Sequence, residues 1–395
     1  MELTSQVLVI GGGVLGTGIA RDLAMRGVNI SLLERGDLAS GASGRDHGLL
    51  ESGARHVTGD VALARTCAEE NAVLRRIAPH CIDDTGGLYL VLDGRAELLY
   101  QPQFVAGCAT AGIAVEELDH RAVLREEPLV APRVIRAYRT RDAVLDPWRL
   151  CVANVLAAQD HGAWAFRGVE VAALLRDGDR VTGAAGRNSI TLQPYTIHAD
   201  YVVNATGAWA GRVAALAGLE LPLAPLATVL VELAHRPASH VLANCRPPTE
   251  GDLIVPRGMG VVLGALEAPA RDADDVAVPD EAPARLLDEA VRMLPVLREV
   301  EVARSWALVR PFPPHPQGTR QVGTPGDTGT EGRDYLLIDH EERDGVGGLV
   351  TVVGGTPTIS RRVAEVASDL LCNKLGVVEP CRTAEEPLPG AAARR

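Results

Sequence analysis

The sequence lacks the features that mark several common protein classes. Lys and Arg (39) are fewer than Asp and Glu (51), and the formal net charge is −12, whereas a nucleic-acid groove needs clustered cations. No apolar run reaches membrane-spanning length, and the N-terminus lacks the basic segment of a secretory signal. We therefore expect a cytoplasmic protein with no nucleic-acid partner and no transmembrane segment. Peripheral membrane contact and homo-oligomerisation stay open.

Cysteine is present but not in the arrangement that binds metal clusters. The seven cysteines are scattered, their number is odd and no C-x-x-C pair occurs. Zinc and iron–sulfur sites usually show such closely spaced pairs, and paired extracellular disulfides favour an even number. We expect reduced thiols and no bound metal.

The first thirty-five residues do carry a strong signal. An apolar run over residues 7–10 leads into Gly11, Gly13 and Gly16, and a second expected strand over 28–33 ends at Glu34. In a dinucleotide-binding βαβ unit, the glycines permit a tight turn, close approach of a pyrophosphate and packing of the helix on the sheet. The acid at the end of the second strand accepts hydrogen bonds from a ribose. The pattern predicts a bound dinucleotide.

Later segments read as further parts of the same sheet. Short apolar runs at 201–205 and 349–353 each end in small residues, and apolar positions over 359–375 recur with helical spacing before Gly376. Other segments mix β-type runs, such as 87–92 and 227–233, with helical stretches such as 284–297. We interpret these as a second domain inserted into the first. The Pro- and Gly-rich segment 311–332 is either a lid or a surface linker.

Several motifs resemble one flavoprotein family. The chain is similar to the family of D-amino-acid oxidase, sarcosine oxidase and FAD-dependent glycerol-3-phosphate dehydrogenase, and most similar to the large subunit of the anaerobic bacterial glycerol-3-phosphate dehydrogenases. The matching segments span nearly the whole chain: 40–55, 146–150, 203–209, 309–311, 336–340 and 344–355.

This resemblance implies an α/β fold. It consists of an FAD-binding Rossmann-like domain of the glutathione-reductase type with an inserted antiparallel-sheet substrate domain. The expected division assigns 1–85, 146–220 and 333–380 to the FAD domain, 86–145 and 221–332 to the substrate domain, and 381–395 to a tail.

The resemblance also implies FAD as cofactor and assigns roles to residues. Glu34 is expected to hold the adenosine ribose, Ser43 to meet the pyrophosphate, and the turn at Gly354 and Gly355 to face the isoalloxazine. A helix N-terminus there suits the negative charge of a reduced flavin. The full set of expected cofactor contacts is Gly11, Gly13, Gly16, Glu34, Arg35, Ser43, Val171, Ala205, Gly207, Gly354, Gly355 and Thr358.

The implied reaction is two-electron oxidation of a secondary alcohol next to an anionic group, with hydride transfer to flavin N5. Arginines equivalent to Arg55, Arg310 and Arg333 surround the small-molecule substrate in relatives. The planar guanidinium binds phosphate or carboxylate bidentately and keeps its charge. We expect substrate contacts from these three residues and from His56 and Thr356.

The sequence departs from the family pattern around this pocket. Thr356 stands in place of a lysine after the paired glycines, and Ala227 replaces a second lysine. Glu51 replaces a histidine, His56 replaces a tyrosine after the arginine, and the tyrosine that follows the first lysine is also missing. Loss of two cations and gain of a carboxylate make the pocket less positive, so a phosphate dianion should bind less firmly.

Glu51 has three interpretations. It acts as general base if its pKa is raised, it accepts a hydrogen bond from a substrate amine or hydroxyl, or it pairs with Arg55 or Arg45. His47 is the other candidate base, and Arg310 the third candidate catalytic residue. The alternatives to alcohol oxidation are an amine or amino-sugar oxidase or dehydrogenase and a flavin-binding subunit without activity. The electron acceptor is open among oxygen, a quinone and a soluble carrier, because the domain tied to electron transfer in relatives is absent from this sequence.

Overall fold

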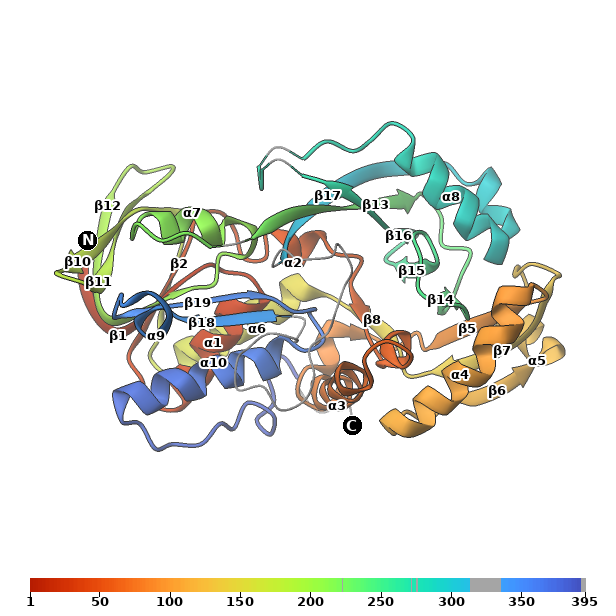
Figure 1. Cartoon of the computed structure of the whole chain (residues 1–395), viewed down its shortest axis with the longest axis horizontal. Coiled ribbons are helices and arrows are strands. Elements are labelled where there is room, and N and C mark those ends of the chain that lie inside the picture. The colour runs from red at the N-terminus through yellow and green to blue at the C-terminus, as the bar shows by residue number, and fades with distance from the viewer. Residues whose placement is uncertain (222, 271, 275, 313–334, 392–395) are drawn as a thin grey trace.

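The protein is built around two large β-sheets that lie side by side (Figure 1). The computed structural model describes all residues except 222, 271, 275, 313–334 and 392–395. In the first sheet the order is β10-β11-β12-β1-β2-β9, and β12 also pairs with β19, which pairs with β18. Its strands are β1 (Glu2–Ile10), β2 (Ile30–Glu34), β9 (Trp164–Arg167), β10 (Val169–Asp177), β11 (Arg180–Asn188), β12 (Pro194–Asn204), β18 (Tyr335–Asp339) and β19 (Leu349–Gly354).

The dinucleotide-binding part of this sheet is parallel. Strands β9, β2, β1, β12 and β19 pair in parallel register, and β18 adds an antiparallel edge. Helix α1 (Val14–Met25) packs against both α6 (Pro147–Asp160) and α10 (Ser360–Leu375), and these helices cover one face (Figure 1). Apolar residues of β1, β2, β12, β19 and the facing helices form one core cluster. The sheet's carboxyl edge, where ligands bind in such folds, is therefore formed by segments far apart in sequence.

The second sheet has the order β17-β13-β16-β15-β14-β5-β7-β6. It is antiparallel as expected, except that β14 pairs in parallel with β5. It has its own core, to which α8 (Ala282–Met293) contributes. Its strands are β5 (Gly87–Leu92), β6 (Glu116–Asp119), β7 (Val134–Thr140), β13 (Ala224–Leu233), β14 (Val241–Asn244), β15 (Leu253–Arg257), β16 (Gly260–Pro269) and β17 (Val302–Phe312).

A small three-stranded sheet lies where the chain passes between the two units. It contains β3 (Leu49–Leu50), β8 (Ala143–Leu145) and β4 (Ile82–Asp83) in that order. The strands of the second sheet all fall within 86–145 and 221–332. The remaining α-helices are α2 (Ala42–Arg45), α3 (Val61–Ile77), α4 (Arg95–Ala111), α5 (His120–Glu126), α7 (Ala210–Ala215) and α9 (His340–Asp344). Short 3₁₀ helices are η1 (Ala54–His56), η2 (Pro79–Cys81), η3 (Gly207–Trp209) and η4 (Pro295–Glu299).

Two element boundaries differ from the sequence expectation for local reasons. The second strand begins at Ile30 rather than Val28, because the Val28 N–H still bonds to the Leu23 carbonyl at the end of α1. The helix expected over 284–297 ends at Met293, since Pro295 has no N–H to continue the helical ladder, and the chain goes on as η4. The expected lid or linker at 311–332 lies almost entirely outside the described residues.

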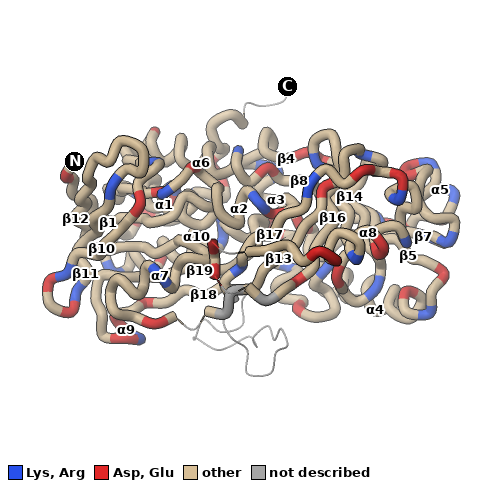
Figure 2. Tube along the Cα trace, turned by 90° about the horizontal axis from the view of Figure 1, so that it is seen from above, with Lys and Arg blue, Asp and Glu red and all other residues tan. Residues whose placement is uncertain are grey.

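Charged residues are mixed along the chain. Figure 2 shows Lys and Arg interspersed with Asp and Glu over both units. Among the described residues, no helix is both long and apolar enough to span a bilayer.

Candidate active site

The turn between β1 and α1 can be formed only by glycine at two positions. Gly11 has φ of +115°, and a Cβ there would lie 2.5 Å from the carbonyl oxygen of Ala205. A Cβ on Gly16 would lie 1.9 Å from the Gly11 carbonyl oxygen. Any side chain would therefore push β1, α1 and β12 apart. The close packing leaves the start of α1 facing the carboxyl edge of the sheet.

The N-terminus of α1 points into the same space. Its N-cap residue, Gly13, offers no side-chain cap, and the hydroxyl of Ser43 accepts a hydrogen bond from the Val14 N–H at 3.1 Å. A Cβ on Gly13 would lie 3.0 Å from that hydroxyl. Exposed N–H groups and the positive end of the helix dipole form an anion-binding site. This site fits a pyrophosphate.

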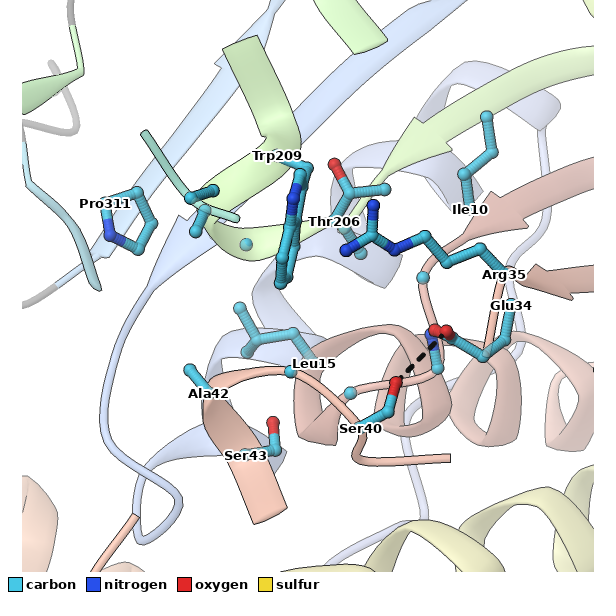
Figure 3. Close-up of a pocket in the computed structure, with 18 of the residues that line it drawn as sticks. Ile10, Leu15, Glu34, Arg35, Ser40, Ala42, Ser43, Thr206, Trp209 and Pro311 are labelled. Carbon is cyan, nitrogen blue, oxygen red and sulfur yellow. Dashed lines mark hydrogen bonds between the residues drawn. The ribbon is translucent and has the colours of Figure 1, made fainter. Parts of the chain in front are cut away.

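Glu34 at the end of β2 is fixed by backbone donors. Its Oε2 accepts from the Gly12 N–H and its Oε1 from the Gly36 N–H, each at 2.7 Å. The Ser40 hydroxyl lies 3.4 Å from Oε1 (Figure 3). A carboxylate has about four lone-pair positions, so the fixed oxygens still have capacity for a ribose diol.

Arg35 and Trp209 border the cavity beside Glu34. The guanidinium carbon of Arg35 lies 4.1 Å from the centre of the Trp209 ring, and Figure 3 shows the two side chains next to each other. Asp274, from the connection after β16, accepts from Arg35 at 3.0 Å and from the Trp209 indole N–H at 2.8 Å. Arg212 donates to the other Asp274 oxygen. The second unit thus contributes to the wall of the dinucleotide cavity.

The cavity itself has a volume of about 560 Å³ and extends from Glu34 to Arg310. Most of the expected cofactor contacts line it, as does one expected substrate contact. These residues are Gly11, Gly13, Glu34, Arg35, Ser43, Val171, Ala205, Gly207, Gly354, Gly355 and Arg310. The glycine turn, the helix N-terminus and the fixed acid therefore fit a dinucleotide cofactor.

The other expected site residues lie outside that lining. Gly16 lies behind the first turn. The Thr358 hydroxyl accepts from the Glu51 N–H at 3.0 Å, and α10 begins two residues later, at Ser360. Between Gly355 and Thr358, Pro357 lines the cavity. Arg333 lies outside the described residues. The expected site residues that are described but do not line the cavity, apart from Gly16, are His47, Glu51, Arg55, His56, Thr356 and Thr358.

Arg310 is not a free cation. Its Nη2 lies 3.2 Å from Oδ2 of Asp46, whose side chain is 8% exposed. Burial acts to raise the pKa of Asp46, but the charges of His47 and Arg310 outweigh it, so the pKa is lowered. Asp46 was not among the expected site residues, although it also lines the cavity. Arg310, one of the expected substrate contacts, thus already has an anionic partner within the protein.

His47 has a defined hydrogen-bonding role. Burial lowers its pKa, and the nearby Asp46 carboxylate opposes this shift. Its Nδ1 accepts from the Leu49 N–H at 3.0 Å and lies 3.1 Å from Asp46 Oδ1. These contacts fix the position of the ring next to Asp46.

Glu51 pairs with His56. His56 Nε2 lies 3.0 Å from Glu51 Oε1, and the glutamate side chain is 9% exposed. Burial acts to raise the pKa of Glu51, but the charge and hydrogen bond of His56 lower it from 4.5 to about 2. A general base needs a pKa raised toward working pH, so this interpretation is not supported. The carboxylate of Glu51 thus has His56 as its partner instead of the expected Arg55 or Arg45.

Arg55 binds a different carboxylate. Its Nη2 donates to Asp252 Oδ1 at 2.8 Å, and the Asp252 side chain is 1% exposed. Although burial opposes it, Asp252 raises the pKa of Arg55. Asp252 precedes β15, 197 positions along the chain, and no local pattern in the sequence marks it. Arg55 and Arg310, the two described arginines that were expected to contact substrate, are therefore each paired with a carboxylate.

Thr356 lies beside the Glu51–His56 pair. It contributes to lowering the pKa of Glu51, yet its buried hydroxyl has no partner of hydrogen-bond geometry in the described part of the chain. Hydrogen bonds weaken steeply outside that geometry, so the hydroxyl keeps capacity for a further partner. The buried hydroxyl of Thr228, next to Ala227 on β13, is in the same situation among the described residues. Thr356 itself replaces one lysine of the family pattern, and Thr228 is next to Ala227, which replaces the other.

Comparison with known proteins agrees with the site. A model of the FAD-dependent oxidoreductase family matches residues 6–354. One curated relative, from Escherichia coli (strain K12), is named as a subunit of anaerobic glycerol-3-phosphate dehydrogenase. It is 39% identical over 393 residues, covering 98% of this chain and 70% of that protein. A protein named as a subunit of the same enzyme in Haloferax volcanii is 40% identical over 400 residues, covering 99% and 67%.

Solved structures share the fold. Glycerol-3-phosphate dehydrogenase from Bacillus halodurans, complexed with FAD, superposes with a TM-score of 0.76 at 24% identity, covering 99% of this chain and 68% of that chain. Glycine oxidase from Geobacillus kaustophilus gives 0.71 at 23% identity, covering 100% and 99%. The family resemblance expected from the sequence motifs is confirmed, and so are the fold class and FAD as cofactor. The chain belongs to the family of FAD-dependent oxidoreductases and is similar over nearly its whole length to glycerol-3-phosphate dehydrogenases.

Proposed function

We propose that this enzyme oxidises the CH–OH group of a small polyol derivative related to glycerol 3-phosphate. FAD, when bound, would supply the two-electron acceptor for this oxidation. The observation that carries the proposal is the position of Arg310, which lines the dinucleotide cavity together with Gly354 and Gly355. An arginine at that end can orient an anionic or hydroxyl oxygen of the substrate.

The chain's own residues then bind and orient the substrate. Arg310 presents guanidinium donors at the cavity end, fixed by Asp46. His47, 3.1 Å from the same carboxylate, helps to fix Asp46. The Gly354 turn, with φ of +90°, brings the backbone close to the cofactor without a side chain between them.

The charge of the site favours a substrate that is less negative than a phosphate dianion. Arg55 and Arg310 each face a buried carboxylate at 2.8 and 3.2 Å, and Glu51 adds a third. A dianion must compete with these carboxylates for the guanidinium donors, in a region where charge interactions are weakly screened. The names of the relatives support glycerol 3-phosphate as a related substrate, and the carboxylates support weaker binding of it here.

Anaerobic bleaching of the bound flavin tests the proposal. The panel contains glycerol 3-phosphate, glycerol, glycerate and 2-amino-1,3-propanediol, each mixed with the purified flavoprotein without oxygen. We expect glycerate or glycerol to reduce the flavin with higher kcat/KM than glycerol 3-phosphate. If 2-amino-1,3-propanediol is the preferred compound, the hypothesis of amine oxidation replaces that of alcohol oxidation. Reduction by none of the four compounds would contradict the proposed function.

The electron acceptor is proposed to be a protein partner. Two of the relatives are named as subunits, which supports transfer of electrons to another chain. Slow reoxidation of the reduced flavin in air-saturated buffer is the expected result. Rapid reoxidation would make oxygen the acceptor.

A further inference from the structure

Three side chains with metal-binding atoms converge beside the cofactor cavity. Glu51, His56 and Cys67 each offer one ligand atom, and these atoms lie within 4.8 Å of one another. The residues come from three elements: the turn after β3, the 3₁₀ helix η1 and the helix α3. Glu51 donates its N–H to Thr358, and Pro357 next to it lines the cavity. The cluster therefore lies directly behind the cavity wall.

The spacing is close to that of a tetrahedral site. With metal–oxygen and metal–nitrogen bonds of about 2.1 Å and a metal–sulfur bond of about 2.3 Å, a tetrahedron separates N from O by about 3.4 Å and S from O by about 3.6 Å. Here His56 Nε2 lies 3.0 Å from Oε1 of Glu51, and Cys67 Sγ lies 3.9 Å from the other carboxylate oxygen, Oε2. The three ligand atoms lie within 4.8 Å of one another, so side-chain rotations that draw them together would be needed to bind an ion.

Burial and charge also suit a divalent cation. The Cys67 side chain is fully buried and Glu51 nearly so, while His56 is 21% exposed. A carboxylate, a thiolate and a neutral imidazole together carry two negative charges and neutralise a 2+ ion. Mixed O, N and S ligands are typical of Zn²⁺, and three protein ligands leave a fourth position open. Thr356, whose hydroxyl is buried, lies beside Glu51.

We propose that Glu51, His56 and Cys67 bind one divalent cation of the Zn²⁺ type. The ion would replace the proton between His56 and Glu51 and the thiol proton of Cys67, both released to solvent, and would tie η1 to α3. Arg55 lies on η1, so the ion would hold the segment that carries a substrate arginine. Successive ligands are 5 and 11 positions apart in the sequence. This spacing lacks a C-x-x-C pair, and the expectation of no bound metal was based on the absence of such pairs.

Cobalt titration of the full-length flavoprotein tests this site. Bound metal is first removed with a chelator, and Co²⁺ is then added while absorbance is followed beyond the flavin bands and, by difference, in the near ultraviolet. We expect one Co²⁺ per chain, intense visible bands of tetrahedral Co²⁺ and a thiolate-to-metal band. No substrate is needed, so the result is independent of the proposed reaction.

Variants identify the ligands. Cys67→Ser should lose the thiolate band and weaken Co²⁺ affinity by more than the roughly 10–100-fold that loss of an outer-shell partner costs. Cys381→Ser, which alters a partly buried thiol bonded to Thr383, is the matched control and should keep both. Glu51→Gln should keep the thiolate band but bind Co²⁺ with weakened affinity. If Cys67→Ser loses its flavin, the Glu51→Gln variant becomes the test of whether these side chains are the metal ligands. Absence of stoichiometric binding, or a thiolate band that survives in Cys67→Ser, would overturn the proposal.

Discussion

Replacement of Asp46 by Asn should shift substrate preference toward phosphorylated compounds. In the structure the Asp46 carboxylate occupies one donor of Arg310 at 3.2 Å and also lies 3.1 Å from His47 Nδ1. Asn keeps the size of the side chain but removes its charge. Arg310 then keeps its full charge for an incoming anion.

The expected effect follows from the strength of one charge-assisted hydrogen bond. Such a bond contributes about 1.5–3 kcal/mol, which corresponds to roughly 10–150-fold in kcat/KM. The lower part of that range applies, because the Arg310 side chain is 25% exposed and solvent screens part of the interaction. We expect the ratio of kcat/KM for glycerol 3-phosphate to that for glycerol to rise about tenfold.

Anaerobic stopped-flow reduction of the flavin measures this ratio directly. Asp93→Asn is the matched control, since Asp93 pairs with Arg133 at the surface and is 58% exposed. The control should leave the ratio unchanged. If Asp46→Asn retains its FAD and its ratio stays at the wild-type value or falls, Asp46 does not compete for the substrate arginine, and the electrostatic reasoning is refuted.

Four further predictions follow from described contacts. Gly13→Val should yield protein without FAD, because the added carbons fill the approach to the N-terminus of α1. The control variant Gly59→Val, at a position with open space, should keep the cofactor. Full flavin absorbance in Gly13→Val would argue against the assigned site. Arg310→Lys should retain FAD but lose about tenfold or more in kcat/KM, because bidentate geometry is lost while the charge stays; near-normal steady-state kinetics would make the residue structural. The double substitution Thr356→Lys with Glu51→His should raise the turnover of glycerol 3-phosphate in the flavin-bleaching assay. If turnover does not rise, these two positions do not determine substrate specificity. Burial raises the pKa of four thiols to about 12, those of Cys81, Cys108, Cys151 and Cys245. They should react with a disulfide reagent at pH 8 only after the protein unfolds. Rapid labelling of the native protein would contradict their burial.

Local sequence signals sufficed for the cofactor half of the site. Gly11 and Gly16 are required by contacts with neighbouring backbone, and Glu34 follows them at the end of the next strand. These residues lie within one βαβ unit, where spacing along the chain determines spacing in three dimensions. A single sequence therefore shows them.

The substrate half depends on contacts that no local pattern encodes. Asp46 meets Arg310 from 264 positions away, and Asp252 meets Arg55 from 197. Sequence analysis identified the arginines through family motifs but could not show that carboxylates already pair with them. Glu51 and His56 are only five positions apart, yet their contact depends on the turn around Gly53, with φ of +88°. Regular helix or strand periodicity does not predict such a pair.

The way the cavity is assembled has a consequence for the order of events during synthesis. Its walls come from segments between Ile10 and Pro357, and the Gly354 turn is contributed by β19, the last strand in the described part of the chain. A chain emerging N-terminus first can form β1, α1 and β2 early, but it cannot enclose FAD until β19 has joined β12. Capture of the cofactor is therefore a late step, and the flavin stabilises the complete chain through mass action. Flavin shortage should leave full-length chains with an open cavity rather than truncated intermediates.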